Sequence, residues 1–430
     1  MTDPSTTSGA PLPTREQIVA GARALRGDAV AMLCDLVRHG SLLGDEGPAQ
    51  AHMAECFRGL GLRVESFAID EARLREHPAW SPSIVSYEGR PNVVGIHEPK
   101  GPVHGRSLIF NGHIDVVPVG ASLLWTRPPF EPHLEHHADG DRLYGRGAAD
   151  MKAGIVAYTM AMKLLQALGC EPAARVILQS VVEEECTGNG ALACLVEGYR
   201  ADAAIITEPT TSALLSAQMG VMWLAIEVFG VPVHASVAHT GVGAIEFARH
   251  LVDRLRELEA KWNLPQHRHP AYCDHVHPVN FNLGRIAGGE WASSVSTHCR
   301  VDLRLGFYPG MRPADVRAEV EALLAAAHRE HPAHASVRFR VDYQGFQAEG
   351  LVVDLTQPAL TTLVDCHRAI AGRDPGTWAF TGTTDVKYFH LHGDMPSTCY
   401  GPGGGNIHGI DEWVSIDAME EVIAVLALYV

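Results

Sequence analysis

Apolar residues in the first half of the chain alternate between helical spacing and short strand-like runs. Helical spacing predicts one helix over 14–37 and a second over about 47–60, which ends at Gly61. The elements predicted after it are strands at 62–67, 92–96 and 107–111, a helix at 154–168, a strand at 175–182, a helix at 190–198 and a strand at 203–207. Strands alternating with helices favour an α/β domain with a central mixed sheet flanked by helices.

The pattern changes after residue 218. The order there is strand, helix, strand, strand, helix, strand, which is typical of a ferredoxin-like α+β domain. The predicted elements are strands at 221–229, 279–286, 297–305 and 337–341 and helices at 243–262 and 313–329. The segment 344–430, with a helix at 358–371 and short strands, is expected to return to the first sheet.

The sequence therefore predicts two domains, one inserted into the other. The α/β domain is expected to comprise 1–218 and 344–430, with the inserted domain at 219–343. Residues 1–13 are polar and rich in Pro, Ser and Thr, so a disordered tail is expected there.

Composition narrows the possible classes of function. The 430 residues carry a formal net charge of -16, which argues against nucleic acid or an anionic membrane as the main partner. The nine cysteines are scattered and contain no CxxC pair, so reduced thiols in the cytoplasm are expected. The first residues do not resemble a signal peptide, and no run of about 18 apolar residues suggests a membrane helix.

Several residues with ligand chemistry stand where predicted strands end. His113 follows the strand 107–111, and Asp115 lies on the same side of an extended segment, where it can orient the imidazole. A histidine with a purely structural role explains the tripeptide from His113 to Asp115 about as well. Asp150 lies in a glycine-rich turn just before a helix; an N-cap aspartate is the simpler interpretation of that turn alone.

Carboxylates follow two further predicted strands. Glu183–Glu185 would repel one another at a buried strand end unless cations were present, although an exposed acidic turn is the alternative. One of these carboxylates can bind metal while its neighbour stays free as a base. Glu208 directly follows the predicted strand 203–207, and His408 lies in a glycine-rich loop. Together, these positions suit two divalent cations bridged by a carboxylate and a water.

The chain resembles the di-zinc metallohydrolases that include acetylornithine deacetylase, succinyl-diaminopimelate desuccinylase, aminoacylase-1 and carboxypeptidase G. The matching strings follow the family's order across nearly the whole chain. They are Gly112–Asp115, Gly145–Gly154, Glu183–Glu185, Thr207–Pro209, Val233–Ala235 and Ile407–Trp413.

The resemblance implies a role for each residue. Asp150 would bridge two divalent cations, with His113 and Glu208 completing one site and Glu185 and His408 the other. The cations would be zinc, with cobalt or manganese as alternatives. Glu184 would be the general base, Asp115 would support His113, and the peptide bond from Asp150 to Met151 would be cis.

The inserted domain would act as a lid and dimerisation domain, and the resemblance implies further roles there. His234, or less favourably His239, would stabilise the oxyanion, often in the partner subunit of a homodimer. Arg304 would bind the substrate carboxylate, with Arg300 as the alternative, and Asn282 would contact substrate.

The function that the resemblance implies is hydrolysis of the amide bond of a small N-acylated, carboxylate-bearing substrate, as in acetylornithine deacetylase. A dipeptidase or carboxypeptidase, or a deformylase of a small heterocyclic amine, would use the same chemistry. A metal-dependent protein that binds small anions without catalysis is a different class, and the presence of Glu184 favours the enzyme. The stretch Gly382–Asp385 resembles one that lines the family's cleft, although an Asx turn is nearly as good an interpretation.

Overall fold

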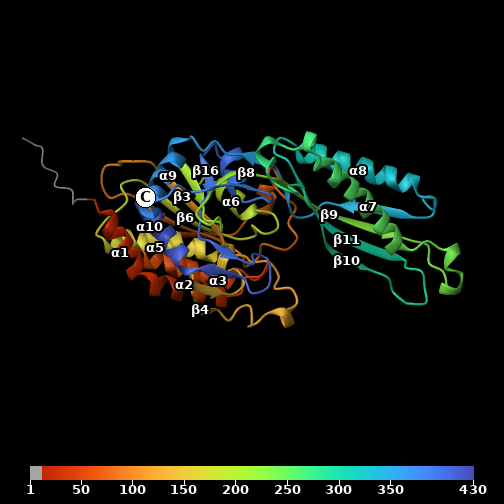
Figure 1. Cartoon of the computed structure of the whole chain (residues 1–430), viewed down its shortest axis with the longest axis horizontal. Coiled ribbons are helices and arrows are strands. Elements are labelled where there is room, and N and C mark those ends of the chain that lie inside the picture. Colours follow the sequence, from red (N-terminus) through yellow and green to blue (C-terminus); the bar gives the residue numbers. More distant parts are fainter. Residues whose placement is uncertain (1–11) are drawn as a thin grey trace, which may run out of the picture.

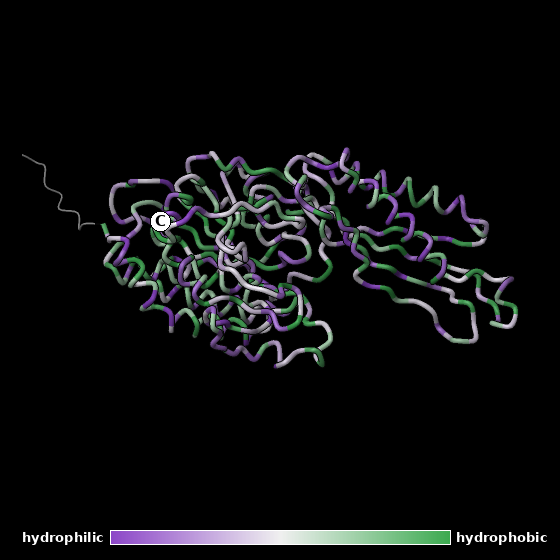
Figure 2. Tube along the Cα trace, viewed as in Figure 1, coloured by the Kyte–Doolittle hydropathy of each residue, from purple (hydrophilic) through white to green (hydrophobic). Residues whose placement is uncertain are grey.

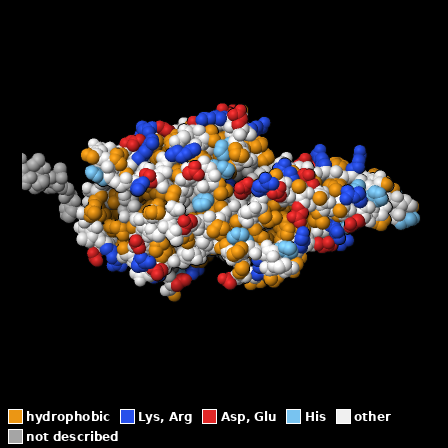
Figure 3. All heavy atoms as spheres, turned by 90° about the horizontal axis from the view of Figure 1, so that it is seen from above, with side chains coloured by type: hydrophobic (Ala, Val, Ile, Leu, Met, Phe, Trp, Pro, Cys, Tyr) orange, Lys and Arg blue, Asp and Glu red, His pale blue; other side chains and the backbone are white. Residues whose placement is uncertain are grey.

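The protein has a broad body and a narrower extension, seen in a computed structural model that describes residues 12–430 (Figure 1). The disordered tail expected at 1–13 falls almost entirely outside the described residues. Within the described range, no helix is both long and apolar enough to cross a bilayer. Positive and negative side chains are interspersed over the face drawn in Figure 3, so the acidic balance does not form a single patch there.

The body is built on a six-stranded mixed sheet with the order β1-β2-β6-β3-β7-β16. Neighbours among the last four strands of this order run parallel, while β1 and β2 are antiparallel additions. The carboxyl ends of the four parallel strands therefore meet at one edge. The strands are β1 (Arg63–Phe67), β2 (Asn92–His97), β3 (Leu108–His113), β6 (Val176–Val181), β7 (Ala203–Ile206) and β16 (Ser397–Cys399).

Helices cover this sheet, as the sequence pattern predicts. They are α1 (Arg15–Ala24), α2 (Arg26–Arg38), α3 (Gly47–Gly59), α5 (Ala153–Ala167), α6 (Asn189–Val196), α9 (Pro358–Ala371) and α10 (Ile416–Tyr429), with the one-turn α4 (Glu71–Leu74) in a connection. The single helix predicted over 14–37 is wrong, because the chain breaks at Leu25. The break lets α1 pack mainly on α10 and α2 mainly on α5, while each keeps its apolar face buried.

Two smaller sheets and the last helix were not predicted. The strands are β8 (Leu214–Gln218), β14 (Leu351–Val352) and β15 (Thr377–Phe380) in one sheet, and β4 (His133–His137), β5 (Gly140–Tyr144), β17 (Gly404–Gly405) and β18 (Trp413–Ser415) in the other. More than half of the residues of α10 are buried, and its second half, 422–428, is a continuous apolar run, so its sequence shows no clear helical stripe. The return of the C-terminal segment to the first sheet is confirmed by β16, which pairs with β7.

The extension has the ferredoxin-like order and topology expected from the sequence. Its sheet runs β10-β11-β9-β12 with antiparallel pairs, and α7 packs on it beside α8. The bounds are β9 (Gly220–Phe229), α7 (Ala244–Trp262), β10 (Phe281–Gly288), β11 (His298–Phe307), α8 (Pro313–Glu330) and β12 (Arg338–Asp342). Hydrophilic and hydrophobic segments are interspersed along the extension (Figure 2). We propose 219–343 as the lid unit; the short β13 (Gln347–Ala348) also pairs with β9.

Candidate active site

Four loops converge at the edge where the parallel strands end. His113 is the last residue of β3, Glu184 and Glu185 follow β6, and Glu208 follows β7. The loop after β16 carries His408. Active sites of α/β sheets lie outside the carboxyl ends of their strands, and this edge has that position.

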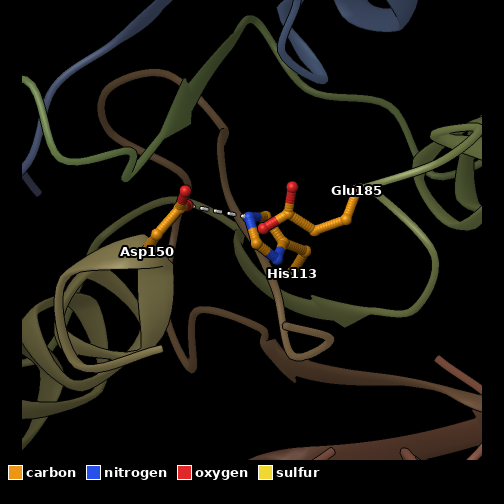
Figure 4. A group of neighbouring side chains, drawn as sticks. All are labelled: His113, Asp150 and Glu185. Carbon is orange, nitrogen blue, oxygen red and sulfur yellow. Dashed lines mark ion pairs between the residues drawn. The ribbon is translucent and has the colours of Figure 1, made fainter. Parts of the chain in front are cut away.

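Asp150 lies between two histidines in this cluster. One of its carboxylate oxygens is 3.3 Å from His113 Nε2, and the other is 3.1 Å from His408 Nε2. Glu185 Oε2 is 3.1 Å from His408 Nε2, and Glu208 Oε2 is 4.0 Å from His113 Nε2. Figure 4 shows His113, Asp150 and Glu185 pointing toward one another from separate segments. The structure thus brings together all five residues predicted as metal ligands.

The cluster holds more carboxylate than its two histidines can satisfy. Glu184 and Glu185 each have one shielded oxygen without a hydrogen-bond partner among the described residues. Burial raises the pKa of Glu208, and burial together with Asp385 raises the pKa of Glu184. Buried carboxylates are costly without compensating charge, so this donor set fits divalent cations. The potential ligand atoms of His113, Asp150 and Glu185, and those of His113, Glu184 and Glu208, lie within 4.8 Å of one another.

Asp115 contacts both His113 and the loop that carries Glu184 and Glu185. Its backbone carbonyl oxygen is 2.9 Å from His113 Nδ1, whereas its carboxylate is 3.6 Å from that atom. A carbonyl oxygen can only accept, so Nδ1 donates and Nε2 keeps its lone pair for a cation. The Asp115 carboxylate instead accepts the backbone N–H groups of Glu184 and Glu185, both at 3.1 Å.

A buried ion-pair network holds the loop that carries Glu184 and Glu185. Arg90 donates to both oxygens of Glu46 at 2.7 and 2.6 Å and lies 3.0 Å from Glu183. The hydroxyl of Tyr87 donates to Glu183 at 2.9 Å. Nothing in the sequence points to Arg90, because its partners come from distant segments.

We expect Arg90→Met to lower the free energy of unfolding by about 3–5 kcal/mol, because it leaves two buried carboxylates without their cation. Urea denaturation measures this change. The matched control is Arg58→Met, which removes an exposed pair with Glu55 on α3 and should change stability by less than about 0.5 kcal/mol. Equal losses in the two variants would contradict the proposed anchoring.

The lid places Arg304 and Asn282 opposite each other on neighbouring strands. Arg304 donates to the backbone oxygen of Thr381 at 2.9 Å, and burial lowers its pKa to about 10. Arg300, the alternative carboxylate receptor, is already paired with two carboxylates of its own sheet. Arg304 is therefore the more available guanidinium of the two.

His234 lies on the exposed surface of the lid, at the start of a short helical turn (Ala235–Thr240). Its Nδ1 lies 2.8 Å from the hydroxyl of Ser236. Among the contacts of residues 12–430, none joins His234 or His239 to the metal-ligand cluster of the same chain.

Asp385, in the stretch predicted to line the cleft, is buried beside Glu184. Both of its carboxylate oxygens lack a hydrogen-bond partner within the described range, and Lys387 Nζ is 3.8 Å away. Burial raises the pKa of Asp385 to about 6. The peptide bond from Asp150 to Met151 is cis, as the resemblance implied.

Comparison with known proteins finds similar hydrolases by both sequence and structure. The chain is 30% identical over 364 residues to the N-formyl-4-amino-5-aminomethyl-2-methylpyrimidine deformylase of Bacillus subtilis, covering 79% of this chain and 82% of that protein. It is 28% identical over 410 residues to the succinyl-diaminopimelate desuccinylase of Dinoroseobacter shibae, covering 93% and 97%. The crystal structure of human carnosine dipeptidase 1 shares the fold, with a TM-score of 0.77 at 15% identity over 97% of this chain and 98% of that one. Residues 109–430 match the model of peptidase family M20/M25/M40, and the chain belongs to that family.

Proposed function

We propose that the protein is an N-acyl amino acid deacylase that uses two divalent cations to cleave an amide bond. The single observation that carries this proposal is the position of Asp150 between His113 and His408, with the buried Glu184 beside them. Such an arrangement provides one bridging carboxylate and one neighbouring acid that can remain free.

The residues would divide into two ligand sets that share Asp150. His113 and Glu208 would hold one cation, and Glu185 and His408 the other. When bound, the cations, with zinc preferred over cobalt or manganese, would polarise the amide carbonyl and make a water molecule more acidic.

Glu184 would act as the general base. It would take the proton of the attacking water and later give it to the leaving nitrogen. Its position supports this role, because its carboxylate lies within 4.8 Å of the potential ligand atoms of His113 and Glu208. Asp115 would keep Glu184 in place by binding its backbone N–H.

We further propose a cytoplasmic homodimer in which His234 serves the active site of the partner subunit. The support is the exposed position of His234 and the outer edge of β10, which has no partner strand within the described residues. Exposed Ile286 and Trp291 lie on and just after that strand. An unpaired edge with exposed apolar side chains suits association with a second copy. Nucleic acid and membranes are not expected as partners.

Arg304 and Asn282 would select the substrate by its carboxylate. A guanidinium binds carboxylate in a bidentate manner, and Arg304 has no carboxylate partner among the described ion pairs. This favours N-acyl amino acids, in line with the similarity to succinyl-diaminopimelate desuccinylase. A deformylase of a small heterocyclic amine is the second candidate, which the 30% identity to the pyrimidine deformylase favours.

A substrate panel tests the proposal. We expect kcat/KM for N-acetyl or N-succinyl amino acids to exceed that for dipeptides and an N-formylated aminopyrimidine by about tenfold or more. The zinc-loaded protein would be assayed with each substrate, then in chelator, and again after zinc, cobalt or manganese is restored. A formyl substrate that ranks first would select the second candidate. Equal turnover in chelator would contradict metal-dependent hydrolysis altogether.

A further inference from the structure

Glu412 has a buried carboxylate that is not among the five predicted metal ligands. It precedes β18 and is fully buried. One of its oxygens accepts the N–H of Gly147 at 2.9 Å and Nη1 of Arg146 at 2.7 Å. The other oxygen accepts the N–H groups of Ala149 at 2.9 Å and Asp150 at 3.0 Å. Both oxygens are therefore fully used within the protein.

These contacts fix the backbone of the turn that delivers Asp150. Three of its N–H groups point at one carboxylate, which makes the turn an anion-binding nest filled by a distant part of the chain. Gly147 has φ of +78°, and a Cβ there would lie 2.4 Å from Val116, so only glycine fits this bend. The direction of the Asp150 carboxylate follows from the position of this backbone.

The same contacts hold the loop of His408. Arg146 Nη2 donates to the backbone oxygen of Gly409 at 2.9 Å, and the N–H of Gly145 donates to the backbone oxygen of Glu412 at 2.9 Å. The His408 side chain is 52% exposed, so packing alone does not hold it in place. The loop and the Asp150 turn are thus locked to each other through Glu412 and Arg146.

The other ligand set is held differently. His113 belongs to β3 inside the main sheet and is 1% exposed, and Glu208 lies two residues after the end of β7. The pairing of β3 with β6 holds His113, and Glu208 lies close to the end of β7, so neither residue contacts Glu412. Both cation positions share Asp150, but the His408 loop, which Arg146 and Glu412 also hold, serves only one of them. Disturbing Glu412 should therefore weaken the position that contains His408 more than the other.

We propose that Glu412 is a positioning residue that assembles the cation position formed by Asp150, Glu185 and His408. The inference rests on the proposed metal centre and adds that the two cation positions depend on different parts of the fold. Arg146 is its partner, because it neutralises Glu412 and reaches the His408 loop at the same time.

Stepwise cobalt titration of the metal-free full chain, followed by calorimetry and visible absorption, tests this proposal. Glu412→Gln replaces one acceptor oxygen by an NH2 group that faces existing donors. We expect it to weaken one of the two binding steps about tenfold or more, and the other by less than about threefold. The matched control is Glu420→Gln, a glutamate of α10 whose pair with Arg26 lies away from the site, and it should leave both steps unchanged.

Circular dichroism melting of the metal-free variants separates positioning from general damage. Two binding steps equal to those of the wild type would overturn the proposal, as would equal weakening of both steps with a lower melting temperature. If Glu412→Gln does not fold, Arg146→Lys provides the same test, because it keeps the charge but loses the reach to Gly409. A wild-type protein that takes up no cobalt would instead contradict the proposed function, and this inference with it.

Discussion

Replacing Glu184 with glutamine is expected to reduce kcat by about 10²–10⁴-fold while the protein keeps both cations. Glutamine has nearly the same size and can still accept the contacts around it, but it cannot take a proton from water. Asp115 binds the backbone of residue 184, so the loop should keep its position in the variant. Steady-state kinetics on the best substrate of the panel, together with elemental analysis of the same preparation, measures both effects.

Glu185→Gln is the matched control, because it changes the neighbouring residue in the same loop. Glu185 Oε2 lies 3.1 Å from His408, so its replacement should weaken one cation position. Measuring the metal content and the turnover of both variants therefore shows which residue is the base and which is a metal ligand. A Glu184 variant that loses a cation, beside a Glu185 variant that keeps both, would show that the two roles are exchanged.

Local sequence patterns predicted most of the fold. The parallel strands β3, β6 and β7 are short apolar runs. The strands and helices of the lid follow one another in the order that their apolar spacing predicts. The helix α10 and the sheet formed by β4, β5, β17 and β18 could not be predicted in this way. The second half of α10, 422–428, is a continuous apolar run without helical spacing, and the strands β17 and β18 are too short to show a period of two.

The candidate site also contains residues that the sequence predicts and residues that only the structure reveals. Its predicted ligands stand at strand ends or in glycine-rich loops, where sequence alone marks them as unusual. Arg90 and Glu412 carry no such mark, because their partners lie in segments far away along the chain. Glu412 lies in the stretch Ile407–Trp413 that resembles the family. Its hydrogen bonds to three backbone N–H groups of the Asp150 turn, however, form only in the folded chain.

Replacing His234 with alanine is expected to lower kcat by about 10²–10³-fold and to change KM much less. An oxyanion donor acts mainly in the transition state, and losing one costs about this much. The exposed position of His234 means that the folded subunit should tolerate the change. His239→Ala is the matched control, because His239 is exposed in the same turn and should keep nearly full activity.

Mixing the His234→Ala and Glu184→Gln proteins shows which subunit supplies the histidine. If His234 acts in the partner's site, each mixed dimer contains one site with an intact Glu184 and an intact His234. An equal mixture that exchanges subunits freely should then recover about one quarter of wild-type activity, although each parent is nearly inactive. If both residues serve their own subunit, no mixed dimer contains an intact site, and the mixture stays as inactive as its parents. Recovery under conditions that prevent subunit exchange would contradict the shared site, because the two parents alone cannot produce it.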